Sequence, residues 1–326
     1  MSSRNDSSEI GTIATGNASG STPYIGRFAP SPTGPLHFGS LLAAVASFLE
    51  ARHRGGQWLL RVEDIDPPRE QPGATDDILR VLENYGFEWD GPISYQSTSQ
   101  DAHVDAIQSL KDAGKAYPCG CSRRDLAAVP RGPLGVIYPG TCRNGCVASD
   151  FALRVLTDDI PVGFDDQLQG SQVQRLESES GDFIILRRDG LIAYQLAVVV
   201  DDNLQGITHV LRGVDLMDST PRQVWLQQLL GYSTPEYCHI PVAINERGQK
   251  LSKSHGAKGV AIDQAETNLV SALEMLGQRP PRDLRSAPLS EVWQWAQEHW
   301  DVNVLVGQTE ISTETSPMAE AENGLS

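Results

Sequence analysis

The stretch over 24–62 constrains the fold of this chain more than any other part of its sequence. A short apolar strand over 24–29 is followed by a loop rich in Pro, Ser and Gly, an apolar-faced helix over 38–54 and a second apolar strand over 58–62. Strand, helix and strand in this order form the repeating unit of a parallel sheet. The sequence therefore predicts an α/β fold, in which ligands bind beyond the carboxyl ends of the strands.

Periodicity and composition organise the remainder of the chain. Helical patterns occur over 75–85, 99–113, 218–230, 267–276 and 289–300, an apolar strand over 209–213, and a buried strand or helix end over 193–200. We expect a flexible extension over 1–22, one α/β domain in two parts over 23–116 and 151–260, a Cys-, Gly- and Pro-rich insertion over 117–150, a short helical segment over 261–305, and a disordered acidic tail over 306–326.

Charge and cysteine usage narrow the classes of protein. The 326 residues carry a net charge of −16, and no apolar run reaches the roughly 18 residues that span a membrane. We therefore expect a cytoplasmic protein without membrane contact. The acidic balance argues against a broad nucleic-acid-binding surface but not against a local basic patch. Four of the five cysteines fall within 119–146, and without an apolar signal segment this clustering favours a metal over disulfides.

Two polar motifs predict a phosphate-binding site. His37 and Gly39 stand where the loop enters the first helix, whose N-terminal amides attract phosphate oxygens. Lys250 and Lys253 share a Gly-containing loop, and two ammonium groups suit a pyrophosphate leaving group. Taken singly, such a histidine is more often a helix cap or surface residue, and such lysines are more often solvated charges. Together they predict a site that binds ATP with Mg²⁺ and breaks it between its first two phosphates.

Four segments resemble one enzyme family. The sequence RFAPSPTGPLHFGS over 27–40 resembles the first signature of glutamyl-type class I aminoacyl-tRNA synthetases, and KLSKS over 250–254 resembles the second. RVEDID over 61–66 and LRGVD over 211–215 resemble two more segments of that catalytic domain. The resemblance implies an ATP-dependent ligase with a Rossmann-like catalytic domain. It implies catalytic roles for His37, Lys250 and Lys253, and ATP binding by His37, Gly39, Ser40 and Lys253.

Three departures from the longer enzymes indicate a subfamily. Only 72 residues (326 minus 254) follow KLSKS, so we expect no anticodon-binding domain, and HFGS lacks a second histidine. With the cysteine insertion, these traits resemble the glutamyl-Q tRNA(Asp) synthetase family. That resemblance implies tRNA-independent activation of glutamate and its transfer to queuosine at the wobble position of tRNA(Asp), and we expect a monomer. The alternatives are a glutamyl-tRNA synthetase that charges the 3′ end, a non-enzymatic tRNA-binding module, and an adenylyltransferase with a small-molecule acceptor.

Charged side chains at strand ends form a candidate amino-acid pocket. Arg27 and Arg212 each follow an apolar strand and suit carboxylates, whereas Glu63 suits an ammonium group. Alternatively, Arg27 pairs structurally with Glu63 or Asp64. The resemblance implies that glutamate is bound by Arg27, Phe28, Ala29, Pro30, Ser31, Glu63, Tyr194 and Arg212.

The cysteine spacing predicts a structural Zn²⁺ site without fixing its fourth ligand. Cys119, Cys121, Cys142 and Cys146 would make a four-thiolate set, with a metal-free loop as the alternative. The resemblance instead implies Cys119, Cys121, Tyr138 and Cys142. Nearby arginines are candidates for docking an anticodon loop, namely Arg123, Arg124, Arg131 and Arg143.

The KLSKS motif generates a first prediction. Replacing Lys253 by Ala removes one of the two ammonium groups that would neutralise the leaving pyrophosphate. We expect the rate of ATP–pyrophosphate exchange to fall about 100-fold, which is typical for the loss of one transition-state contact. Lys258→Ala, five positions further on, is the control and should leave the exchange rate nearly unchanged. A rate near that of the unaltered chain in Lys253→Ala would refute the assignment.

Overall fold

A central, mostly parallel sheet organises the molecule. The computed structural model describes residues 22–132, 135–245, 250 and 259–312. One half of the sheet consists of β1 (Ile25–Phe28), β2 (Gln57–Val62) and β3 (Ser94–Tyr95), all parallel. The other half has the order β11 (His209–Gly213), β12 (Glu236–Ile240), β8 (Pro161–Asp166) and β9 (Gly170–Arg175), with only β9 antiparallel. The amide of Thr208 donates to the carbonyl of Ile25 over 3.0 Å, and this hydrogen bond joins the two halves. The parallel strands confirm the predicted α/β fold.

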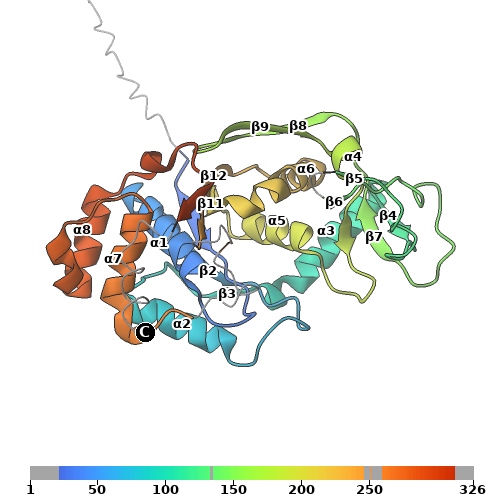
Figure 1. The fold of residues 1–326 in the computed structure, drawn as a ribbon. Helices are drawn as coiled ribbons and strands as arrows, with labels where there is room; N and C mark the ends of the chain where they lie inside the picture. Colours follow the sequence, from blue (N-terminus) through green and yellow to red (C-terminus); the bar gives the residue numbers. More distant parts are fainter. Residues whose placement is uncertain (1–21, 133–134, 246–249, 251–258, 313–326) are drawn as a thin grey trace, which may run out of the picture.

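Helices cover both faces of this sheet (Figure 1). One face packs against α1 (Phe38–His53), α2 (Ala74–Asn84), α7 (Ala265–Met275) and α8 (Leu289–His299), and the other against α3 (Gln100–Asp112), α5 (Tyr194–Leu204) and α6 (Thr220–Leu230). Strand β2 shows why two cores form. Trp58 and Leu60 belong to the first core, whereas Leu59 packs against the second, as alternation along a strand requires.

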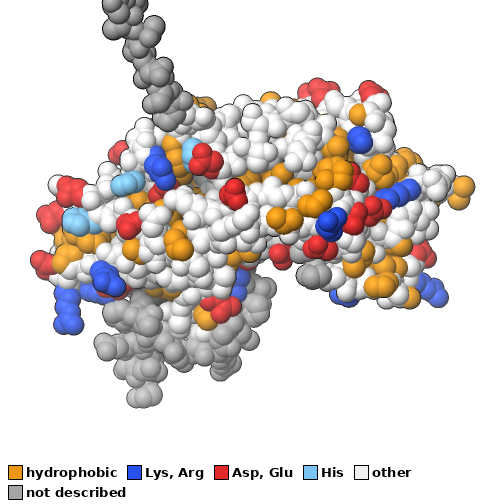
Figure 2. Space-filling model, turned by 90° about the horizontal axis from the view of Figure 1, so that it is seen from above, with side chains coloured by type: hydrophobic (Ala, Val, Ile, Leu, Met, Phe, Trp, Pro, Cys, Tyr) orange, Lys and Arg blue, Asp and Glu red, His pale blue; other side chains and the backbone are white. Residues whose placement is uncertain are grey.

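The insertion forms a separate small sheet at one end of the molecule (Figure 1). Strand β4 (Ala116–Cys119), where the insertion begins, pairs antiparallel with β7 (Ala152–Val155), which pairs with β10 (Ile184–Leu186); both of these follow the insertion. Within the insertion, β5 (Arg131–Gly132) pairs with β6 (Gly135–Val136). The ribbon of β8 and β9 runs from the central sheet toward this end. Apolar side chains are prominent over the same end of the surface (Figure 2). Large apolar side chains that are exposed include Phe151, Ile160 and Val173.

Short helices complete the described chain. They are α4 (Leu176–Glu179), η1 (Gln96–Ser99), η2 (Val214–Ser219), η4 (Ile262–Gln264), η5 (Arg282–Ser286) and η6 (Val302–Leu305). Within the described ranges, no helix combines the length and hydropathy that crossing a bilayer demands.

Two expectations need correction or refinement. The apolar segment over 193–200, left open as a strand or helix end, lies in helix α5. The tail expected to be disordered over 306–326 is ordered at its start, because β14 (Glu310–Ser312) pairs in parallel with β13 (Val242–Ile244). Backbone hydrogen bonds with β13 hold these residues despite their acidic surroundings. The extension expected over 1–22 lies outside the described residues except for its last position.

Candidate active site

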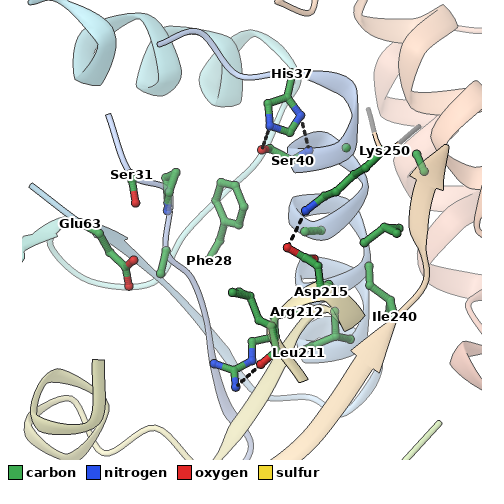
Figure 3. Close-up of a pocket in the computed structure, with 18 of the residues that line it drawn as sticks. Phe28, Ser31, His37, Ser40, Glu63, Leu211, Arg212, Asp215, Ile240 and Lys250 are labelled. Atoms are coloured by element: carbon green, nitrogen blue, oxygen red, sulfur yellow. Dashed lines mark hydrogen bonds and ion pairs between the residues drawn. The ribbon is translucent and has the colours of Figure 1, made fainter. Parts of the chain in front are cut away.

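A cavity of about 540 Å³ opens where β1, β2 and β11 end (Figure 3). It lies at the carboxyl edge of the sheet, where the fold predicted a ligand site. The structure brings together twelve residues singled out in the sequence, which line this cavity: Arg27, Phe28, Ala29, Pro30, Ser31, His37, Gly39, Ser40, Glu63, Tyr194, Arg212 and Lys250. Lys253 lies outside the described residues.

His37 both caps helix α1 and lines the cavity. Its Nδ1 accepts from the amide of Ser40 over 3.2 Å, and its Nε2 lies 3.1 Å from the Ser40 hydroxyl (Figure 3). The more common interpretation of such a histidine, a helix cap, is therefore confirmed alongside its place in the pocket. The chain returns to this point at Gly259, which forms a bridge with His37. A Cβ atom at Gly259 would lie 2.9 Å from the Cβ of Pro35, so a larger residue would push the two segments apart.

Lys250 lines the same cavity. Its ammonium group forms an ion pair with the carboxylate of Asp215 (Figure 3). Both side chains are more than one-third exposed, at 38% and 36%, so the pair orients the lysine rather than contributing much stability. Asp215 ends the LRGVD segment, but nothing in the local sequence predicts this pairing.

Arg27 is held by a partner that is distant in sequence. Its Nε and Nη2 donate to the two carboxylate oxygens of Asp202, on α5, over 3.0 and 3.3 Å. Arg61 on β2 also contacts Asp202, with 2.8 Å between Nη1 and Oδ1. The alternative pairing of Arg27 with Glu63 or Asp64 is therefore wrong, and both arginines are almost fully buried, at 4% and 1% exposure.

Burial acts differently on the two acidic groups of this network. Burial alone would raise the pKa of Asp202, but the charges of Arg27 and Arg61 outweigh it and hold that pKa below its usual value. For Glu63 burial prevails and raises the pKa, although Arg61 and Arg27 oppose it. The nearest guanidinium nitrogen of Arg61 is 3.5 Å from Glu63. Glu63 is thus an incompletely neutralised carboxylate at the cavity wall, which suits a cationic ligand group.

Arg212 offers an unused donor. Its Nε donates to Nε2 of His239 over 3.0 Å, and its Nη2 donates to the hydroxyl of Thr220 over 2.8 Å. Its Nη1 is buried and has no hydrogen-bond partner among the described residues. A buried guanidinium N–H without an acceptor lowers the stability of the folded protein unless a ligand supplies an acceptor. Tyr194, which also lines the cavity, has its pKa raised by burial, so its hydroxyl stays protonated and able to donate.

A second cluster lies in the insertion. The Sγ atoms of Cys119, Cys121 and Cys142 lie within 4.8 Å of one another, as donors around one metal ion would. The hydroxyl oxygen of Tyr138 lies 3.3 Å from Sγ of Cys119 and 3.7 Å from Sγ of Cys121. Cys146 does not belong to this group of thiols. Three thiol groups at this separation could hold a metal ion.

Arg143 differs from the other arginines expected to dock an anticodon loop. Its guanidinium donates to both carboxylate oxygens of Asp182 over 2.7 Å and forms an ion pair with Glu177. Arg143 therefore ties the insertion to the segment before β10. By contrast, Arg123, Arg124 and Arg131 are exposed.

Comparison with known proteins defines the class and then the family. The sequence matches the family model for the catalytic domain of class I tRNA synthetases (E and Q) over residues 25–131 and 147–277. The chain is thus an ATP-dependent ligase built on a class I tRNA synthetase catalytic domain. It is 52% identical over 295 residues to a glutamyl-Q tRNA(Asp) synthetase of Dechloromonas aromatica, covering 89% of this chain and 98% of that protein. The corresponding protein of Pseudomonas aeruginosa PAO1 is 51% identical over 279 residues, with 85% and 94% covered. The chain belongs to the glutamyl-Q tRNA(Asp) synthetase family.

Solved structures agree on the fold. A glutamate-tRNA synthetase from Elizabethkingia anophelis superimposes with a TM-score of 0.75 at 22% identity, over 93% of this chain and 70% of that one. A glutamate tRNA ligase from Elizabethkingia meningosepticum gives a TM-score of 0.73 at 23% identity, over 90% and 68%.

The buried network around Asp202 generates a prediction about stability and pH. Asp202→Asn leaves two buried guanidinium groups without a full counter-charge, so we expect the free energy of unfolding at pH 7 to fall by about 3 kcal/mol. Since the folded-state pKa of Asp202 is lowered, its contribution is present above the unfolded-state value near 4 and is lost as the pH falls through the folded-state value. The difference between the two proteins should therefore shrink below about pH 4.

Urea unfolding followed between pH 3.5 and 7 tests this expectation. Asp77→Asn, which breaks an exposed pair with Arg80, serves as control and should change little at any pH. Equal destabilisation by Asp202→Asn across the whole range would contradict the assigned ionisation.

Proposed function

We propose that this enzyme activates glutamate with ATP in the absence of tRNA and then transfers the glutamyl group to queuosine at the wobble position of tRNA(Asp). The observation that carries the proposal is the match of charges around one cavity. Two arginines and one incompletely neutralised glutamate line it, and glutamate carries two carboxylates and one ammonium group. The names of the relatives support the same substrate and acceptor for those proteins.

In this proposal Arg27 and Arg212 bind the carboxylates and Glu63 binds the ammonium group. Nη1 of Arg212 is free to donate, and guanidinium groups match carboxylates in geometry and charge. The hydroxyl of Tyr194 adds a donor. The segment from Phe28 to Ser31 forms the adjoining wall of the cavity.

The chemistry needs positioning more than proton transfer. An oxygen of the α-carboxylate attacks the α-phosphorus of ATP in line, the bond from that phosphorus to the β-phosphate oxygen breaks, and pyrophosphate leaves. The attacking carboxylate is already ionised, so no general base is required. His37, Gly39 and Ser40 at the start of α1 receive phosphate oxygens, and Lys250 and Lys253 neutralise the leaving group. Mg²⁺ bound with ATP would add positive charge at the phosphates.

The second step transfers the acyl group. A ring hydroxyl of queuosine attacks the carbonyl carbon of glutamyl-AMP and an ester forms. AMP leaves with the electron pair of the broken anhydride bond, and its phosphate takes up the proton of the hydroxyl. Arg123, Arg124 and Arg131 are the exposed cations of the insertion that we assign to the phosphates of the anticodon loop. Arg143 is excluded from this role by its pairs with Asp182 and Glu177.

Two assays test the proposed function. The chain should catalyse glutamate-dependent ATP–pyrophosphate exchange without tRNA. It should also attach labelled glutamate to queuosine-containing tRNA(Asp) from which the 3′-terminal adenosine has been removed, because this RNA cannot be charged at its 3′ end. The matched control is the same shortened tRNA lacking queuosine, which should stay unlabelled. Labelling confined to tRNA with an intact 3′ end would indicate a glutamyl-tRNA synthetase instead.

We also propose that Cys119, Cys121, Tyr138 and Cys142 hold one structural Zn²⁺. The donor set fits, since three thiols and one phenol oxygen converge, and the amide of Cys142 holds that oxygen in place over 3.0 Å. The guanidinium of Arg154 lies 3.8 Å from the centre of the Tyr138 ring and would stabilise a phenolate there. Bound zinc would fasten β4 to the segment over 138–142.

Metal content distinguishes the two candidate fourth ligands. Cys142→Ser should lose bound zinc, Tyr138→Phe should bind zinc at least tenfold more weakly, and Cys146→Ser should retain it, since its thiol lies outside the cluster. Zinc would be quantified in purified protein after dialysis against a weak chelator. Loss of zinc in Cys146→Ser with retention in Tyr138→Phe would overturn the ligand set.

A further inference from the structure

A chain of buried hydrogen bonds extends from Arg212 on the side away from the cavity. Nε of Arg212 donates to Nε2 of His239, its neighbour across β11 and β12, over 3.0 Å. Nδ1 of His239 lies 2.6 Å from Oδ2 of Asp166 at the end of β8. His239 is fully buried and Asp166 is 4% exposed. The three residues thus lie in line across three adjacent strands, and only Arg212 lines the cavity.

The partners of Asp166 determine which nitrogen of His239 carries the proton. Oδ1 of Asp166 accepts the amides of Leu168 and Gln169 over 3.0 and 2.9 Å. The amide of His239 donates to both oxygens, over 3.2 Å to Oδ1 and 3.1 Å to Oδ2, and Oδ2 also accepts from Nδ1–H of His239. Nε2 then presents its lone pair to Nε–H of Arg212, and a second donor of Arg212 is taken by Thr220. Burial lowers the pKa of His239 and keeps it uncharged beside the guanidinium, although Asp166 opposes this effect.

We propose that Asp166 and His239 are positioning residues that fix the guanidinium of Arg212 so that its free Nη1–H meets a carboxylate of the bound amino acid. The inference deepens the proposed function and rests on it. With Nε and Nη2 both engaged, rotation of the guanidinium would break two buried hydrogen bonds. The pair therefore governs affinity for the amino acid and has no contact with the phosphate end of the cavity around His37 and Lys250.

Three substitutions separate the positioning role from a purely structural one. His239→Phe keeps the ring but removes the acceptor, and we expect the KM for glutamate in pyrophosphate exchange to rise at least about tenfold, as loss of a hydrogen bond to a charged group implies. The KM for ATP should stay within about twofold. His239→Gln, whose carbonyl oxygen can replace Nε2, should recover most of the affinity for glutamate.

Asp166→Asn is the sharper test, because it preserves shape. The Asn oxygen must take the place of Oδ1 to accept the amides of Leu168, Gln169 and His239, so its NH₂ group faces Nδ1 of His239. The proton of His239 then lies on Nε2. Two N–H groups, Nε2–H of His239 and Nε–H of Arg212, then face each other, so the hydrogen bond between them is lost. We expect a rise in the KM for glutamate similar to that in His239→Phe, and ¹⁵N NMR of labelled histidine should report the change of tautomer.

The control is His209→Phe, at the far end of β11, where the histidine stacks on Tyr24 and does not contact Arg212. It should leave both KM values unchanged, and thermal unfolding of every variant checks that the fold persists. The inference is overturned if His239→Phe and Asp166→Asn leave the KM for glutamate within about twofold, or raise the KM values for glutamate and ATP in parallel. Absence of glutamate-dependent exchange in the unaltered chain would instead overturn the proposed function.

Discussion

The buried salt bridges of Asp202 with Arg27 and Arg61 are the interaction on which the site depends. They join β1, β2 and α5, three elements that are distant in sequence, at the point where the strands end. Burying three charges costs more than packing apolar side chains of equal size would. The gain lies in geometry, since one counter-charge locks two guanidinium groups and leaves Glu63 beside them only partly neutralised. The pocket wall therefore presents both signs of charge on a rigid frame.

The parts of the site that local motifs encode could be predicted from the sequence. His37 and Gly39 stand at a loop-to-helix junction that composition makes visible, and Lys250 lies in a short polar motif. The partner of Arg27 could not be found in this way, because Asp202 is 175 positions away. The run of apolar residues before it fits a buried strand as well as a buried helix. In the structure it is a helix, on which Asp201 accepts from Gln96 and Asp202 accepts from Arg27.

Composition also gave wrong predictions for segments whose structure depends on a few contacts. The acidic character of the chain after residue 306 predicts disorder, yet three residues there find a neighbouring strand. In the sequence, Arg143 cannot be told apart from the other arginines of the insertion. It pairs with Asp182 because the chain folds back on itself, which no local pattern predicts. Asp166, His239 and Thr220 carry no motif, so their convergence on Arg212 becomes visible only when three strands and a helix are assembled.

The late position of β14 has a consequence for biosynthesis. Strand β13 leads toward Lys250, and its parallel partner β14 is encoded more than sixty residues (310 minus 244) further along. On the ribosome, where chains fold from the N-terminus onward, β13 must wait with an unpaired edge until residues 310–312 have emerged. Strand β13, whose Val242 and Ala243 line the cavity, thus gains its pairing with β14 only after Arg27, Arg61 and Asp202 have been synthesised.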